Sequence, residues 1–101
     1  MHADTVAAWL VQHLAFPFIL DKRLFGSFVR APSLANDVDV FVEYSNGHVI
    51  DAVEIRSFIA PAFLRRFHLP IHLLLLSEAE TRHQEVVLGK LLKESLSLQK
   101  P

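Results

Sequence analysis

The chain has 101 residues, contains no cysteine and carries a formal net charge of −1. This length fits one domain, and the lack of thiols excludes disulfide bonds and cysteine catalysis. A nearly neutral chain without a basic stripe has no electrostatic basis for tight, sequence-independent binding of nucleic acid, so nucleic acid is not an expected partner.

The first part of the chain predicts a helix, a strand and a glycine turn. Residues 4–14 carry apolar side chains at helical spacing, and Pro17 ends this helix. Residues 18–25 are predicted as a strand that runs into Gly26 and Ser27. Glycine lets the backbone approach a ligand without a Cβ in the way. A short helical turn after it would present free amides to phosphate oxygens, so this turn is a candidate phosphate-binding site.

Asp37 and Asp39 open the next predicted strand, residues 37–44. Successive side chains of a strand point to opposite faces, so the two carboxylates share one face and the valines between and after them occupy the other. Two close carboxylates repel each other without a cation. Oxygen ligands suit Mg²⁺, which takes its remaining ligands from water and substrate phosphates. Each half also has a simpler explanation, as a plain loop at Gly26 and as solvated or capping aspartates.

The remaining elements predict a small α+β domain. A turn at residues 45–47 precedes a helix over residues 50–66, which Pro61 should kink or divide. Residues 69–76 form a strongly apolar strand, expected to be buried on both faces and central in its sheet, and residues 78–98 form a last helix. The order αββαβα fits a small mixed sheet backed by helices.

The motif Gly26-Ser27-x-x-Arg30, followed by Asn36-Asp37-Val38-Asp39, resembles the signature of minimal (MNT-type) nucleotidyltransferases of the DNA-polymerase-β-like superfamily. The resemblance is densest over residues 20–45. It implies a nucleotidyltransferase (polymerase-β-like) fold and Mg²⁺-dependent transfer of a nucleotidyl group. Gly26 and Ser27 would contact the triphosphate, and Asp37 and Asp39 would be the catalytic, metal-holding pair. Arg30 is either a solvated cation or a partner of phosphate or carboxylate.

His72 marks the main departure from that family pattern. The family normally supplies a third carboxylate from a later strand, and His72 stands about where it would be. An imidazole can accept a proton or ligate a softer metal than magnesium, but it does not replace the charge of a carboxylate. Otherwise the six histidines show no zinc-site spacing.

Two functions of different class therefore remain open. The first is an enzyme that uses a nucleoside triphosphate, with ATP as the expected nucleotide, to modify an unknown acceptor. Small members of the family resemble the antitoxin half of toxin–antitoxin pairs and work beside a helical HEPN-type protein. The second is a catalytically degenerate module that binds a nucleotide or a partner protein, or forms a homodimer.

The sequence also predicts where the protein works. No charged-then-apolar leader is present, and the longest apolar run, residues 71–76, is too short to cross a bilayer. We expect a cytoplasmic protein with no membrane partner, built as a single nucleotidyltransferase-like domain over residues 1–101.

Overall fold

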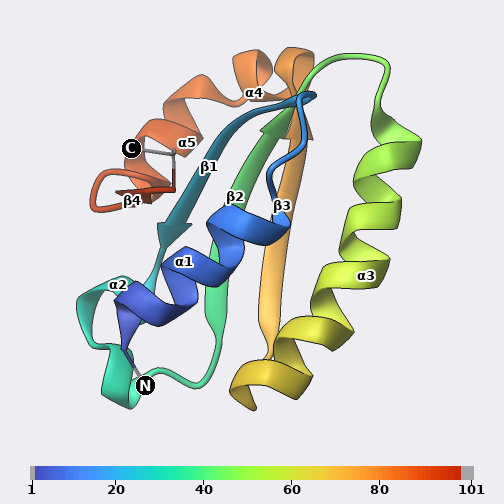
Figure 1. The fold of residues 1–101 in the computed structure, drawn as a ribbon. Coiled ribbons are helices and arrows are strands. Elements are labelled where there is room, and N and C mark those ends of the chain that lie inside the picture. Colours follow the sequence, from blue (N-terminus) through green and yellow to red (C-terminus); the bar gives the residue numbers. More distant parts are fainter. Residues whose placement is uncertain (1, 99–101) are drawn as a thin grey trace.

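A four-stranded sheet in the order β3-β2-β1-β4 forms the centre of the computed structural model, which describes residues 2–98 (Figure 1). Strand β1 (Ile19–Phe25) pairs antiparallel with both β2 (Val38–Tyr44) and β4 (Leu96–Ser97). Strand β3 (Ile71–Ser77) pairs parallel with β2. The predicted α+β class with a small mixed sheet is confirmed.

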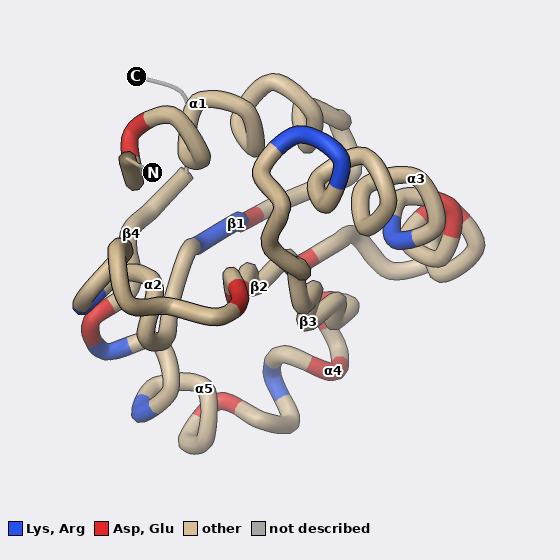
Figure 2. Tube along the Cα trace, turned by 90° about the horizontal axis from the view of Figure 1, so that it is seen from below, with Lys and Arg blue, Asp and Glu red and all other residues tan. Residues whose placement is uncertain are grey.

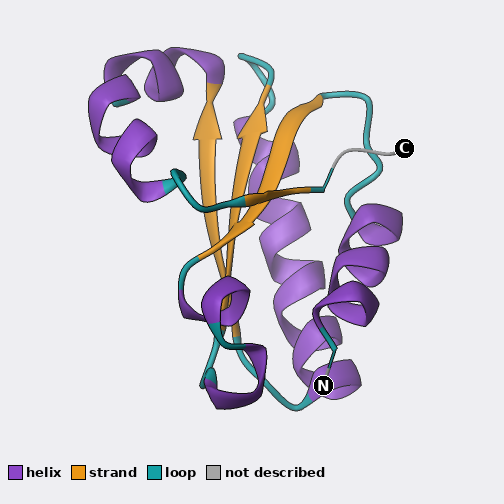
Figure 3. Cartoon of the chain, turned by 90° about the vertical axis from the view of Figure 1, so that its left-hand side faces the viewer, coloured by secondary structure: helices purple, strands orange, loops and turns teal. Residues whose placement is uncertain are grey.

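Helices lie on both faces of this sheet (Figure 3). On one face, α1 (Ala3–His13) and α3 (Val49–Phe67) enclose the main apolar core together with the alternate valines of β2. On the other face, α4 (Glu78–His83) and α5 (Glu85–Leu91) cover a smaller cluster of Phe41, Leu76 and Leu88. These two short helices cover only part of the second face, and polar side chains at its other end reach solvent.

The first five predicted elements occur in the predicted order, with short additions. A four-residue helix, α2 (Ser27–Arg30), and a 3-10 helix, η1 (Pro32–Leu34), connect β1 to β2. The predicted turn between β2 and α3 is present, with Gly47 at a φ of 90°. Strand β4 is a further addition after the helices.

Of the two outcomes predicted for Pro61, a kinked or a divided helix, the division does not occur. Helix α3 runs without interruption from Val49 to Phe67 with Pro61 inside it. Proline removes one backbone donor, and the acceptor left without a partner is the carbonyl of the residue four positions earlier. That residue, Ser57, is exposed, so water can satisfy its carbonyl.

Two further expectations are corrected. Strand β3 is an edge strand of the sheet that residues 2–98 form, not a central one. The Arg56 side chain donates a hydrogen bond of 2.8 Å to the Leu73 carbonyl of this strand. The predicted helix over residues 78–98 is divided into α4 and α5. Helix α5 ends at Leu91, and the chain then forms strand β4. Pairing with β1 overrides helical propensity at this point, because Leu96 pairs with Leu24 and the Leu98 amide donates to the Lys22 carbonyl at 2.8 Å.

No helix within residues 2–98 combines the length and the apolar character that crossing a membrane requires. Basic and acidic residues are interspersed along the chain, without a continuous basic stripe (Figure 2).

Candidate functional site

Strand β2 presents its aspartates on the face of the sheet opposite the main core. Val38, Val40 and Val42 are fully buried on the side of α1 and α3. Asp39 alternates with them along the strand, and Asp37 precedes the strand by one residue. Both aspartates are partly exposed, with 35% and 26% of the Asp37 and Asp39 side chains accessible. The predicted separation of carboxylates from valines is confirmed.

Gly26 lies directly against the Asp39 carboxylate. The antiparallel pairing of β1 with β2 sets Phe25 opposite Asp39, which brings the following residue, Gly26, to this side chain. A Cβ on Gly26 would lie 2.6 Å from Asp39 Oδ2, closer than atoms can approach without displacement. Its φ of 81° and ψ of −159° also belong to a backbone region that is essentially restricted to glycine. The backbone conformation therefore strongly favours glycine at this position, and a larger residue would also displace the Asp39 carboxylate.

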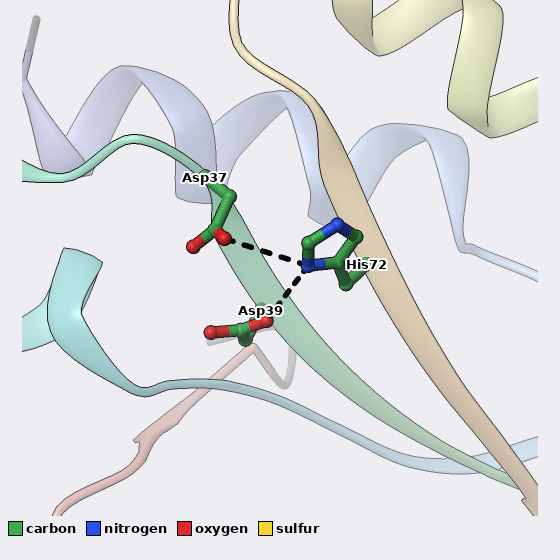
Figure 4. Close-up of side chains that lie close together, drawn as sticks. All are labelled: Asp37, Asp39 and His72. Carbon is green, nitrogen blue, oxygen red and sulfur yellow. Dashed lines mark ion pairs between the residues drawn. The ribbon is translucent and has the colours of Figure 1, made fainter.

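Strand β3 brings His72 to the same carboxylates. Its parallel register with β2 sets His72 opposite Asp39. His72 Nδ1 lies 3.4 Å from Asp39 Oδ1 and 3.6 Å from Asp37 Oδ2 (Figure 4). The imidazole is 63% exposed, so solutes can reach it. His72, the residue at which the sequence departs from the resembled family pattern, therefore lies beside the aspartate pair.

The three side chains can jointly hold a cation. Asp37, Asp39 and His72 each offer one ligand atom, and these atoms all lie within 4.8 Å of one another. Two carboxylate oxygens and one imidazole nitrogen form a donor set that divalent metals accept. The residues present thus fit the divalent metal that the family resemblance implies.

Ser27 and Arg30 are near the aspartates in sequence but not in contact with them through their side chains. Ser27 is the exposed first residue of α2, and Arg30 is the exposed last residue of the same helix. Among residues 2–98, neither side chain forms a hydrogen bond or ion pair with another. Both side chains are therefore available for contacts with a ligand, and their predicted roles stay predictions.

A second polar region lies at the other end of the same face, under α4 and α5. Here a cavity of about 560 Å³ is lined by acidic, basic and apolar side chains. Glu43 stands opposite Asp21 in the sheet, four residues along β2 from Asp39 and on the same face. Burial, with added repulsion from Asp21 and Glu78, raises the pKa of Glu43 above its usual value of 4.5. Glu43 is thus too far along the strand to complete the Asp37 and Asp39 pair. This cavity could not be predicted from the sequence, because α4 and α5 form its wall through tertiary packing.

No protein-family model matches the sequence, and no curated protein matches it. Solved structures share its fold. A mutant of the toxin–antitoxin MntA–HpeT carrying two Asp-to-Glu substitutions matches with a TM-score of 0.62 at 16% identity, over 100% of this chain and 75% of the other. A toxin–antitoxin structure with AMP-PNP matches with a TM-score of 0.61 at 17% identity, over 95% of this chain and 73% of the other. A Tyr-to-Ala mutant of MntA–HpeT matches with a TM-score of 0.59 at 17% identity, over 100% and 74% of the two chains. The chain therefore shares the fold of these toxin–antitoxin chains.

Proposed function

We propose that this chain is a single nucleotidyltransferase-like domain that binds a nucleoside triphosphate together with a divalent metal ion at Asp37 and Asp39. The observation that carries the proposal is the contact between Gly26 and the Asp39 carboxylate, with Asp37 beside it. The turn has a backbone conformation that favours glycine, and it packs against the Asp39 carboxylate with Asp37 nearby. This arrangement has no evident structural purpose of its own. It does suit a phosphate group placed between backbone amides and a carboxylate-bound cation.

The proposed roles follow from the position of each residue. Gly26 and Ser27 supply backbone and hydroxyl contacts to phosphate oxygens, and Arg30, exposed one turn further along α2, supplies a positive charge. Asp37 and Asp39 hold the metal, for which Mg²⁺ is the ion that the family resemblance implies. When bound, such a metal neutralises charge on the phosphate oxygens during in-line transfer. The reaction proposed is transfer of a nucleotidyl group to a hydroxyl-bearing acceptor.

ATP is the nucleotide and a protein is the partner that we propose. Toxin–antitoxin complexes are among the structures with this fold, and one of them was solved with AMP-PNP, an ATP analogue. Another carries Asp-to-Glu substitutions at two positions separated by one residue, which is also the spacing of Asp37 and Asp39. We therefore place this chain as an antitoxin-like protein beside a HEPN-type partner, with self-association as the competing arrangement.

A second function is favoured by one specific observation. His72 lies beside Asp39, and the family resemblance leads us to expect a third carboxylate at about this position. A neutral imidazole contributes no negative charge to a second metal ion, and two-metal chemistry needs that ion near the attacking oxygen. The alternative is a degenerate module that keeps nucleotide binding and acts by gripping its partner.

Calorimetric titration with ATP and GTP, with and without Mg²⁺, tests the proposal. The wild-type protein should bind nucleotide only with metal, and the Asp37→Asn, Asp39→Asn double variant should not bind it. A Glu54→Gln, Glu94→Gln double variant removes the same amount of charge from exposed positions and should bind as wild type does. Equal binding by the aspartate variant, or no binding by the wild type under any condition, would refute the site. Incubation with labelled ATP and the co-expressed partner then separates transfer from binding alone.

A further inference from the structure

We propose that His72 is a metal ligand, and that Asp37, Asp39 and His72 together form a site that prefers Zn²⁺ to Mg²⁺. This inference deepens the proposed function and rests on its assignment of the two aspartates as ligands. It differs from the family expectation in two respects: the preferred metal is Zn²⁺ and not Mg²⁺, and the third ligand is a histidine and not a carboxylate.

The position of His72 supports a ligand role. The parallel register fixes its Cα opposite that of Asp39, so the ring is held beside β2 by the sheet and not by a flexible loop. Its Nδ1 faces both carboxylates at once, at 3.4 Å from Asp39 and 3.6 Å from Asp37 (Figure 4). A simple ion pair with a protonated imidazole is the competing explanation for these contacts, and the experiment below distinguishes the two.

The spacing of the three donors suits one shared ion. His72 Nδ1 lies 3.4 Å from Asp39 Oδ1 and 3.6 Å from Asp37 Oδ2, and one ligand atom from each of the three residues lies within 4.8 Å of the others. Bonds of about 2.0–2.1 Å to a single ion place neighbouring ligand atoms roughly 3 Å apart, so small side-chain movements bring all three donors onto one metal.

The chemistry of the donors favours zinc over magnesium. Imidazole nitrogen suits zinc and other transition metals, whereas magnesium binds carboxylate oxygen and water. Affinities of a mixed nitrogen and oxygen site rise along the first-row series, so replacing a carboxylate with His72 shifts the preference away from Mg²⁺. Three protein ligands also leave a coordination position open, as in catalytic zinc sites. A phosphate oxygen of the proposed nucleotide can take that position.

Metal titrations without nucleotide test this inference directly. Zn²⁺ and Mg²⁺ binding are measured by calorimetry, and Co²⁺, as a coloured substitute for zinc, is followed by its visible absorption. Wild-type protein should bind one Zn²⁺ more tightly than Mg²⁺. Loss of a partner that only orients a ligand already costs about 10–100-fold in affinity, so His72→Ala should lower Zn²⁺ affinity on the order of 100-fold. The matched control, His83→Ala, removes an exposed histidine from the end of α4 and should leave zinc binding unchanged.

A second variant tests the choice of metal. His72→Asp supplies a third carboxylate at the same register position, so Mg²⁺ affinity should rise while Zn²⁺ affinity falls. Because the His72 side chain is largely exposed, neither variant should lose the fold, and thermal unfolding verifies this. Zinc binding that is unaffected by His72→Ala, or a wild-type protein that binds Mg²⁺ as tightly as Zn²⁺, would overturn the inference and establish the ion pair instead.

The outcomes separate this inference from the proposed function. Mg²⁺-dependent ATP binding that requires Asp37 and Asp39, combined with zinc binding indifferent to His72, would refute the inference and leave the function standing. Zinc binding that depends on His72, combined with no nucleotide binding under any condition, would refute the function and leave the metal site established.

Discussion

Replacing Gly26 with alanine should damage both the stability of the fold and the proposed metal site. The φ of 81° and ψ of −159° at this residue lie in a region used essentially by glycine, and holding another residue there costs about 1–3 kcal/mol. The new Cβ would also lie 2.6 Å from Asp39 Oδ2. Because Asp39 is a flexible and partly exposed side chain, it can relieve this contact by rotating, but it then leaves its position beside Asp37 and His72.

The expected loss of unfolding free energy is therefore about 1–3 kcal/mol, with most of it from the backbone. Each kcal/mol corresponds to about 4–8 °C of melting temperature in a domain near this size. A typical domain has about 5–15 kcal/mol of stability in total, so the variant should fold and remain measurable. Urea denaturation gives the stability, and calorimetry with Zn²⁺ and Mg²⁺ gives the metal affinity.

Gly47 offers a matched control in the turn before α3. It also has a positive φ, of 90°, but a Cβ there would meet no heavy atom within 4 Å. Gly47→Ala should lose stability through its backbone alone and keep metal binding, whereas Gly26→Ala should lose both. Undiminished metal affinity in Gly26→Ala, or an equal loss in both variants, would refute the placement of Gly26 against the metal ligand.

Two further predictions concern stability away from the site. Burial beside Asp21 and Glu78 raises the pKa of Glu43, so the folded state favours the protonated form of this side chain. Ionisation of Glu43 therefore lowers the free energy of unfolding at pH 7. This loss disappears as the pH falls below the ordinary pKa of 4.5, because Glu43 is then protonated in both the folded and the unfolded state. Glu43→Gln should raise the free energy of unfolding at pH 7 and leave it unchanged near about pH 3.5, and an equal gain at both pH values in urea denaturation would contradict this cause. Pro61→Ala should stabilise the protein by about 2 kcal/mol, because proline inside a helix costs about 3 kcal/mol and returns less than about 1 kcal/mol by restricting the unfolded chain. A lower melting temperature for Pro61→Ala would show that the ring makes contacts the helix depends on.

Local patterns were sufficient to predict half of the candidate site. The alternation of Asp37 and Asp39 with buried valines follows from strand geometry alone, and the structure bears it out. The need for glycine at position 26 was also readable, since a Gly-Ser turn after a strand is a short-range signal. The close contact between Gly26 and Asp39 was not readable, because it depends on the register that pairs Phe25 with Asp39.

Long-range pairing explains what the sequence could not show. The apolar composition of β3 predicted a central strand, but position in a sheet is set by which strands find partners, and β3 has one strand partner in the part of the chain described. The local sequence predicts that residues 96–97 belong to the end of a helix. They form a strand instead, because they pair with the free edge of β1, which lies far away in the sequence. Because of this pairing with β1, the chain after α5 does not continue as a helix.

The site thus combines a fixed half with an exchangeable half. The backbones of Gly26 and Asp39 are held by paired strands, and Gly26 has a conformation that favours glycine, so a substitution of Gly26 costs stability. His72 lies on an edge strand with most of its side chain in solvent, so a change there alters the proposed donor set with little effect on packing. In the proposed site, the identity of the bound metal therefore depends on one exposed residue, whereas the glycine turn is set by the fold. If His72→Asp proved as destabilising as Gly26→Ala, His72 would also be part of the structural framework, and this distinction between the two residues would be wrong.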